Sequence, residues 1–184
     1  RGRMIMLSKP FRSRPHARMG EALYERAVDQ ARQPNFYTTL GVADRIDARF
    51  ELYTLHALLL ILRLRDEDKT GEAGGAEAAQ ALFDAYVSAL DHALRELGVG
   101  DTSVGKKMRK LGEAMYGRMQ AYETPLRDGD QSALASGLAR NVYESDDPAT
   151  GEALARYALN SRQRLAAQGF GDLVKSPDWA EVAA

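Results

Sequence analysis

The segment from residue 46 to residue 64 constrains the fold most, because as a helix it is apolar around its whole circumference. At about 100° per residue, one stripe holds Ile46, Phe50, Tyr53, Ala57, Leu60, Ile61 and Leu64, and the opposite stripe holds Leu52, Leu55, Leu59 and Leu62. Such a helix is either the buried centre of a bundle or is covered in part by a partner. We favour the buried centre. His56, which lies between the stripes, is then a hydrogen-bonded core residue.

The rest of the chain also repeats its apolar residues at helical spacing, and no sustained alternation of apolar and polar residues indicates a strand. With 184 residues, of which 45% are hydrophobic and 28% charged, the chain has the size and composition of one globular domain. We therefore predict an all-α fold, a single compact bundle of about six to seven helices over residues 16–184. Residues 1–15 are expected to form a flexible basic arm.

Proline, glycine and capping residues divide the chain into the expected helices. The ranges are about 16–32, 44–65, 76–97, 103–122, 132–143 and 148–168. A loop over residues 35–43 follows the first helix, and an acidic, glycine-containing loop follows the second. The pair Thr124-Pro125 is expected to stop the fourth helix.

The sequence excludes several kinds of chemical site. The absence of cysteine excludes disulfides, thiolate metal sites and cysteine nucleophiles. No secretory signal and no membrane span of about 20 apolar residues is expected. The segment Gly100–Lys107 begins like a phosphate-binding loop, but Lys107 stands where a serine or threonine would hold magnesium.

The three histidines, His16, His56 and His92, show no ligand spacing. We expect no catalysis, no metal and no other cofactor.

The expected fourth helix has two different faces. Its apolar stripe consists of Val104, Met108, Leu111, Met115, Met119 and Tyr122, which we interpret as core. The opposite half carries Lys106, Lys107, Arg109, Lys110 and Arg118 against Glu113 alone. Such a face is either an ordinary solvated surface or one that attracts anionic lipid headgroups, ribosomal RNA or an acidic protein surface.

Two stretches resemble the ubiquinol–cytochrome c chaperone family. The first reads N-F-Y-T-T-L-G-V-A-D-R-I-D-A-R-F-E-L from Asn35, and the second reads L-G-V-G-D-T-S-V-G-K-K-M-R-K-L-G-E-A-M-Y-G-R-M-Q-A-Y from Leu97. The resemblance runs from about Leu23 to Tyr143. Its most specific parts are F-Y-x-x-L-G-V, D-x-R-F-E-L and Y-G-R-x-x-A-Y. Ala43 and Arg45 depart from the proline and threonine that relatives often have there.

The resemblance implies an all-α chaperone that binds newly made cytochrome b and assists biogenesis of the ubiquinol–cytochrome c reductase without catalysis. Its expected partners are apo-cytochrome b or another apolar protein segment, together with the ribosome and an anionic membrane surface, and no specific DNA. The expected location is cytoplasmic, peripheral at the inner membrane. We expect a groove between the second and fourth helices to hold the apolar segment.

The motifs of the resemblance and the basic face together supply the predicted partner-binding residues. They are Phe36, Tyr37, Leu40, Asp44, Arg49, Asp101, Lys106, Lys107, Lys110, Tyr116, Arg118 and Tyr122. Some of them have an alternative structural interpretation: Arg49 beside Glu51 as an ion pair, and Asp101 as a helix cap.

Two other functions stay open at this point. A ribosome- or RNA-associated module would use the basic fourth helix, and its affinity would fall with salt. A small-molecule enzyme would need a polar cavity inside the bundle.

Overall fold

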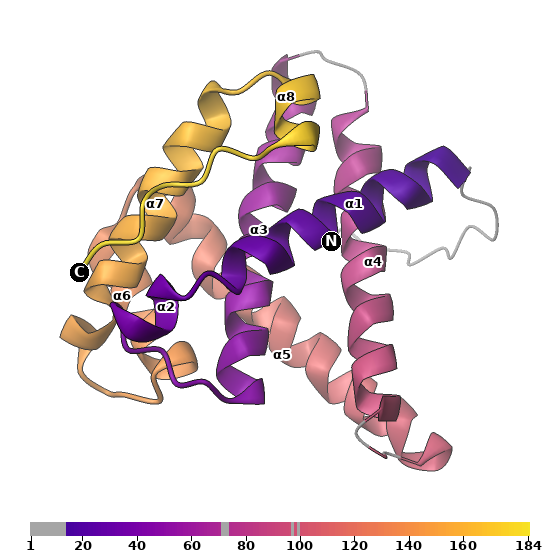
Figure 1. Cartoon of the computed structure of the whole chain (residues 1–184), viewed down its shortest axis with the longest axis horizontal. Coiled ribbons are helices and arrows are strands. Elements are labelled where there is room, and N and C mark those ends of the chain that lie inside the picture. The colour runs from indigo at the N-terminus through magenta and orange to yellow at the C-terminus, as the bar shows by residue number, and fades with distance from the viewer. Residues whose placement is uncertain (1–13, 71–73, 97, 99) are drawn as a thin grey trace, which may run out of the picture.

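The protein is an all-helical bundle, as predicted (Figure 1). The computed structural model describes residues 14–70, 74–96, 98 and 100–184, with the backbone alone at residues 14, 67–70, 101, 102, 104, 105, 107, 108, 111 and 112. The α-helices within these ranges are α1 (Arg14–Ala31), α2 (Asn35–Thr38), α3 (Ile46–Thr70), α4 (Gly75–Glu96), α5 (Asp101–Asp128), α6 (Gln131–Val142), α7 (Glu152–Ala167) and α8 (Phe170–Lys175). A 3-10 helix, η1 (Pro148–Gly151), precedes α7. The described residues contain no strand.

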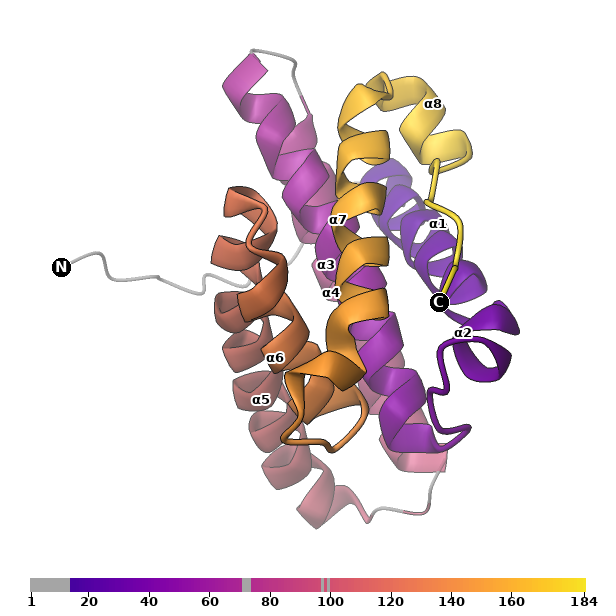
Figure 2. The same ribbon diagram turned by 90° about the vertical axis from the view of Figure 1, so that its left-hand side faces the viewer.

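Helix α3 is the centre of the bundle, which confirms the interpretation of its two apolar stripes. Every residue from Leu52 to Leu64 is buried. Helices α1, α4, α5, α6 and α7 all contact α3, and Figure 2 shows α5 and α6 on one side of it and α1 and α8 on the other. A helix that is surrounded in this way needs apolar residues on all faces.

Two glycines allow neighbouring elements to pack closely. A Cβ atom on Gly20 would overlap the backbone carbonyl of Ala81, so α1 crosses α4 with almost no side chain between them. In the same way, a Cβ on Gly151 would overlap the carbonyl of Ala135, which brings η1 against α6. These contacts fix the outer helices around α3.

Three expected boundaries are wrong, each because tertiary contacts outweigh the local signal. The expected loop after the first helix contains α2, because Phe36 is fully buried and draws one helical turn against the core. Helix α3 continues past residue 65 to Thr70. The carboxylate of Asp66, on this extension, accepts hydrogen bonds from Arg127 on α5 at 2.8 Å and from Arg162 on α7 at 3.0 Å.

The third wrong boundary is the end of α5, which passes through Pro125 and stops at Asp128. Proline costs one backbone hydrogen bond inside a helix. Burial of Leu126, which is 3% exposed, and the Arg127–Asp66 ion pair stabilise the extra turn. Gly129, with a φ of 67°, then ends the helix in the left-handed conformation that glycine favours.

The basic arm expected over residues 1–15 falls almost wholly outside the described residues, which begin at residue 14. None of the described helices is long and apolar enough to cross a membrane.

Candidate functional site

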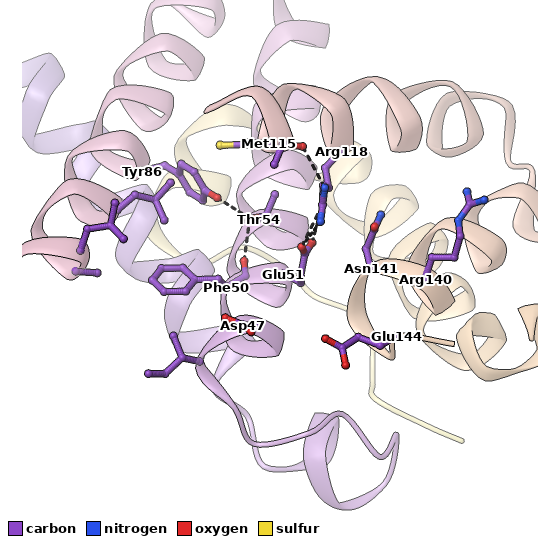
Figure 3. A pocket seen from close by; sticks show the side chains of 15 residues that line it. Asp47, Phe50, Glu51, Thr54, Tyr86, Met115, Arg118, Arg140, Asn141 and Glu144 are labelled. Carbon is purple, nitrogen blue, oxygen red and sulfur yellow. Dashed lines mark hydrogen bonds and ion pairs between the residues drawn. The ribbon is translucent and has the colours of Figure 1, made fainter. Parts of the chain in front are cut away.

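A pocket of about 440 Å³ opens between the first half of α3, the last half of α4, the middle of α5 and the end of α6 (Figure 3). This volume lies within the range of small ligand-binding pockets. Four helices contribute side chains to it. They are Ile46, Asp47, Phe50, Glu51 and Thr54 from α3, Tyr86, Leu90, Ala93 and Leu94 from α4, Ala114, Met115 and Arg118 from α5, and Arg140, Asn141 and Glu144 from α6 and the residues after it.

One wall of the pocket is apolar. Leu90 and Met115 are 4% and 6% exposed and belong to a small hydrophobic cluster with Tyr86. Ile46, at the start of α3, is 52% exposed and leaves a large aliphatic side chain at the edge of the pocket. An apolar pocket edge that is open to solvent is typical of a protein-binding site.

The floor of the pocket carries an ion pair between α3 and α5. The Nε of Arg118 donates to Glu51 Oε2 at 3.2 Å and its terminal nitrogen donates to Oε1 at 2.8 Å, so the pair is bidentate. The two side chains are 29% and 17% exposed. The hydrogen bonds to Glu51 raise the pKa of Arg118 above its ordinary value although partial burial opposes this. The Arg118 guanidinium is therefore charged at neutral pH.

Beside this pair, two hydroxyl groups join α3 and α4. The Thr54 and Tyr86 oxygens lie 2.6 Å apart, and the Thr54 hydroxyl also lies 2.8 Å from the Phe50 carbonyl. Since a carbonyl only accepts, Thr54 donates to Phe50 and Tyr86 donates to Thr54. Burial raises the pKa of Tyr86 above its ordinary value, so its hydroxyl stays protonated. The edge of the pocket between α3 and α4 is thereby held in place.

The opposite side of the pocket is formed by the end of α6. Asn141 donates to the Tyr122 hydroxyl at 2.8 Å, and burial raises the pKa of Tyr122 to about 12. Glu144 follows α6 and accepts a hydrogen bond from Arg45 at 3.0 Å. In Figure 3 the Glu144 carboxylate is directed toward the pocket, and the Arg140 guanidinium is directed away from it. The described residues contain no group of three or more histidine, aspartate or glutamate side chains that could hold a metal ion.

The opposite face of α3 contributes to a second group of polar side chains, which is closed to solvent. His56 is fully buried; its Nδ1–H donates to the Leu52 carbonyl at 2.7 Å, and its Nε2 accepts from the Tyr157 hydroxyl at 2.8 Å. Gln30 on α1 donates to the same hydroxyl at 3.1 Å. Burial lowers the pKa of His56 to about 4, so the ring is neutral. The expectation of a hydrogen-bonded core histidine is confirmed.

Aromatic rings seal this group of polar side chains. Phe36 and Trp179 contact the His56 ring edge-on, with ring centroids 5.3 and 5.1 Å away. The C-terminal segment that carries Trp179 is held by the Ala180 amide, which donates to Ser161 on α7 at 3.1 Å. Every buried side-chain nitrogen and oxygen of the described residues has a hydrogen-bond partner.

Comparison with known proteins shows the family of the chain. The family model of the Ubiquinol-cytochrome C chaperone matches residues 38–176. The chain belongs to this chaperone family. The crystal structure of the Cbp3 homolog from Brucella abortus superposes with a TM-score of 0.78 at 32% sequence identity, and the match covers 91% of each chain. A search of curated proteins finds no match.

The residues carried over from the chaperone motifs do not form one site. Arg118 lies on the pocket floor. Phe36 and Tyr122 are 0% and 1% exposed and pack the core, and their role in partner binding stays a prediction. Tyr37 is half-buried and donates to the Ala31 carbonyl at 3.3 Å, and the Leu40 carbonyl accepts from Tyr143 at 2.9 Å.

Asp44 and Arg49 form an exposed ion pair with each other, with Arg49 Nε 2.6 Å from the Asp44 carboxylate. The expected pairing of Arg49 with Glu51 is therefore wrong. Residues two apart on a helix point to nearly opposite sides, so Glu51 faces Arg118 on α5 instead.

The basic face of α5 is smaller than predicted. Lys106 and Lys110 are exposed, and Tyr116 is 52% exposed. Arg118 does not belong to this face, because its side chain is directed into the bundle toward Glu51. The side chains of Asp101 and Lys107 lie outside the described residues. The backbone shows that Gly100 is the N-cap of α5, so the prediction of Asp101 as the cap is wrong.

Thr54, Tyr86 and Asn141 were not found from the sequence. Thr54 gave the only local signal, because it interrupts an apolar helix. A threonine in a core helix can also donate its hydroxyl to the backbone carbonyl of the preceding turn, as Thr54 does to Phe50. A threonine at this position therefore does not distinguish a functional site from the core.

Proposed function

We propose that this chain is an assembly chaperone of the ubiquinol–cytochrome c reductase that binds newly made cytochrome b, and that it acts by protein binding without catalysis. The family supports the assembly role. The observation that carries the binding proposal is the pocket that α3 and α5 line together with α4 and the end of α6.

The chemistry of the pocket suits a segment of an unassembled membrane protein. Such a segment exposes apolar side chains that have not reached the lipid, and the wall of Ile46, Leu90, Leu94 and Met115 offers them an apolar surface. The ion pair and hydroxyl pair behind this wall are already satisfied by the protein. An apolar occupant therefore does not have to supply their partners.

We propose that the protein works at the cytoplasmic face of the inner membrane, where cytochrome b is inserted. Cytochrome b then contacts the pocket before the remaining subunits of the reductase cover cytochrome b. Its other proposed contacts there are the ribosome and the anionic membrane surface, through Lys106, Arg109 and Lys110, which are exposed on α5.

Affinity purification of the tagged chain from membranes of its own host tests the client. We expect apo-cytochrome b to be retained. The variant Ile46→Asp/Leu94→Asp places two charges on the apolar wall at partly exposed positions, and each buried aliphatic side chain contributes about 1.5–3 kcal/mol. We expect it to retain at least about tenfold less cytochrome b.

The matched control is Gln120→Asp, which adds a charge at an exposed position of α5 outside the pocket and outside the predicted partner-binding residues. It should retain cytochrome b at the wild-type level. Normal reductase levels in a strain that lacks the chain would contradict the proposal, as would equal retention by the wall variant.

The exposure of Lys106, Arg109 and Lys110 supports a second candidate, an RNA- or ribosome-binding module. Three phosphate contacts on single-stranded RNA predict a slope of about −2 for log affinity against log salt concentration. Affinity for ribosomes that does not change between low and high salt would remove this candidate.

A further inference from the structure

The mouth of the pocket is acidic. Its fifteen lining residues carry three carboxylates and two guanidinium groups. Glu51 and Arg118 neutralise each other on the floor, and Arg140 is directed away from the opening in Figure 3. The carboxylates of Asp47 and Glu144 are left at the opening, where both side chains are exposed.

These two acids come from different parts of the chain. Asp47 lies in the first turn of α3, where an acid interacts favourably with the helix dipole. That effect does not apply to Glu144, which follows the C-terminus of α6. Glu144 pairs with Arg45, but both side chains are exposed, at 63% and 58%. Exposed pairs of this kind contribute little and are screened by salt, so Arg45 does not prevent Glu144 from binding another cation.

The acidic mouth adjoins the apolar wall. Leu90 and Leu94 line the α4 side, and Ile46 lies next to Asp47 at the start of α3. The surface complementary to this arrangement is an apolar stretch that is followed directly by positive charge. A purely apolar peptide would bring no positive charge to the two carboxylates, and a purely basic peptide would leave the wall uncovered.

The size of the pocket limits how much of a client it can hold. A membrane-spanning helix has about 20 residues and is about 30 Å long. A volume of about 440 Å³ equals roughly fifteen water molecules of liquid, which is room for a few side chains. The pocket therefore contacts one end of such a segment, and the charge at its mouth decides which end.

We infer that the pocket binds the basic-flanked end of an apolar membrane segment, with the apolar side chains on the α4 wall and a lysine or arginine at Asp47 and Glu144. Membrane segments carry their excess of lysine and arginine at the cytoplasmic end, so the pocket distinguishes that end from the other. This inference rests on the proposed function, because it names the part of the client that the proposed site takes.

Three fluorescent peptides test it with the purified full chain. They share about eight apolar residues, and their four-residue flanks consist of lysine and arginine, of glutamine, or of glutamate. By fluorescence anisotropy we expect the basic peptide to bind about three- to tenfold more tightly than the glutamine peptide, and the glutamate peptide most weakly. The preference should shrink as salt is raised.

The variant Asp47→Asn/Glu144→Gln should bind the basic and glutamine peptides equally. Its matched control, Glu21→Gln/Glu25→Gln, removes two exposed carboxylates from α1, outside the pocket, and should keep the full preference. All four positions are exposed, so circular dichroism should show melting temperatures close to the wild-type value for both variants.

Equal binding of the basic and glutamine peptides by the wild type would overturn the inference and leave the proposed function standing. A preference that survives in Asp47→Asn/Glu144→Gln would overturn it as well, because the cation would then bind elsewhere. Failure of all three peptides to bind would contradict the proposed function itself and this inference with it.

Discussion

The two faces of α3 look into regions of opposite character. On one face, His56, Tyr157 and Gln30 form a closed centre in which each polar group has its partner inside the protein. On the other face, Glu51 and Thr54 border a pocket whose mouth is open. Residues 51 and 56 differ by about 140° around the helix axis, so one helix supports both regions.

This difference between a closed centre and an open pocket predicts which residues mainly affect stability and which mainly affect client binding. A fully buried hydrogen-bonded group is expensive to leave without its partner, so changes in the closed centre should lower the free energy of unfolding. In the pocket, water can reach the groups that lose a partner, so changes there should cost less stability and act mainly on the client.

The largest contrast is expected between two phenylalanines. Phe36→Ala removes a fully buried ring that contacts His56 and Tyr157 and should lower the free energy of unfolding by about 3–5 kcal/mol. Phe50→Ala removes a half-buried ring that lines the pocket and should cost about 1–2 kcal/mol. Urea unfolding measures both values.

Client binding should show the reverse order. The folded fraction of Phe36→Ala should bind cytochrome b normally, and Phe50→Ala should bind it weakly. A Phe36→Ala protein that stays stable but no longer binds the client would support Phe36 as a partner-binding residue. It would contradict the separation of stability in the closed centre from binding in the pocket.

Removing one hydroxyl from each region gives a more closely matched pair. Tyr157→Phe leaves His56 Nε2 and the Gln30 amide without their shared partner, and we expect a loss of about 2–3 kcal/mol. Tyr86→Phe leaves Thr54 still bonded to the Phe50 carbonyl, so the loss should be about 1 kcal/mol. Equal losses in urea unfolding would mean that the pocket side is as closed as the His56 side.

The pH dependence of stability should come from the closed centre. Burial holds the pKa of His56 at about 4 in the folded chain, below its ordinary value of 6.5, so between these values the unfolded chain binds the extra proton. This contribution is complete above about pH 6.5 and is lost as the pH falls toward 4. Between pH 7 and pH 5 we expect a loss of about 2 kcal/mol.

The control for this effect is His56→Gln, which cannot titrate in that range. It should be less stable than the wild type at pH 7 but should lose about 2 kcal/mol less between pH 7 and pH 5. Parallel curves for the two proteins would show that His56 is accessible to protons in the folded state.

The closed centre was largely predictable, because it depends on periodicity. Two apolar stripes on one helix require cover on both sides, and a single histidine between them has to find partners in the core. The boundaries that failed, at Phe36 and Pro125, depend on contacts with distant residues. A buried Leu126 and an ion pair between Arg127 and Asp66 hold a turn that a local signal would end.

The pocket was less predictable, since its polar residues come from helices far apart in the sequence. Arg118 was found through the family motif but assigned to the basic face, because position 118 borders both the apolar stripe and that face. Only the position of α3 decides that it faces Glu51, 67 residues earlier. Glu144 takes its direction from a positive φ of 52°, which is uncommon outside glycine and has no signal in the sequence.

The smallest effect is expected on the pocket floor, at the ion pair between Glu51 and Arg118. A double-mutant cycle with Glu51→Gln and Arg118→Met should give a coupling energy of about 1 kcal/mol in urea unfolding. The bidentate geometry and exposed fractions of 17% and 29% place the pair above a surface pair and below a buried one. A coupling energy near 4 kcal/mol would indicate that the pocket closes over the pair in solution and excludes water, as the His56 centre does. A value near zero, with client binding lost in both single variants, would instead make the two charges contacts for the client, and the pocket floor would then belong to the binding surface.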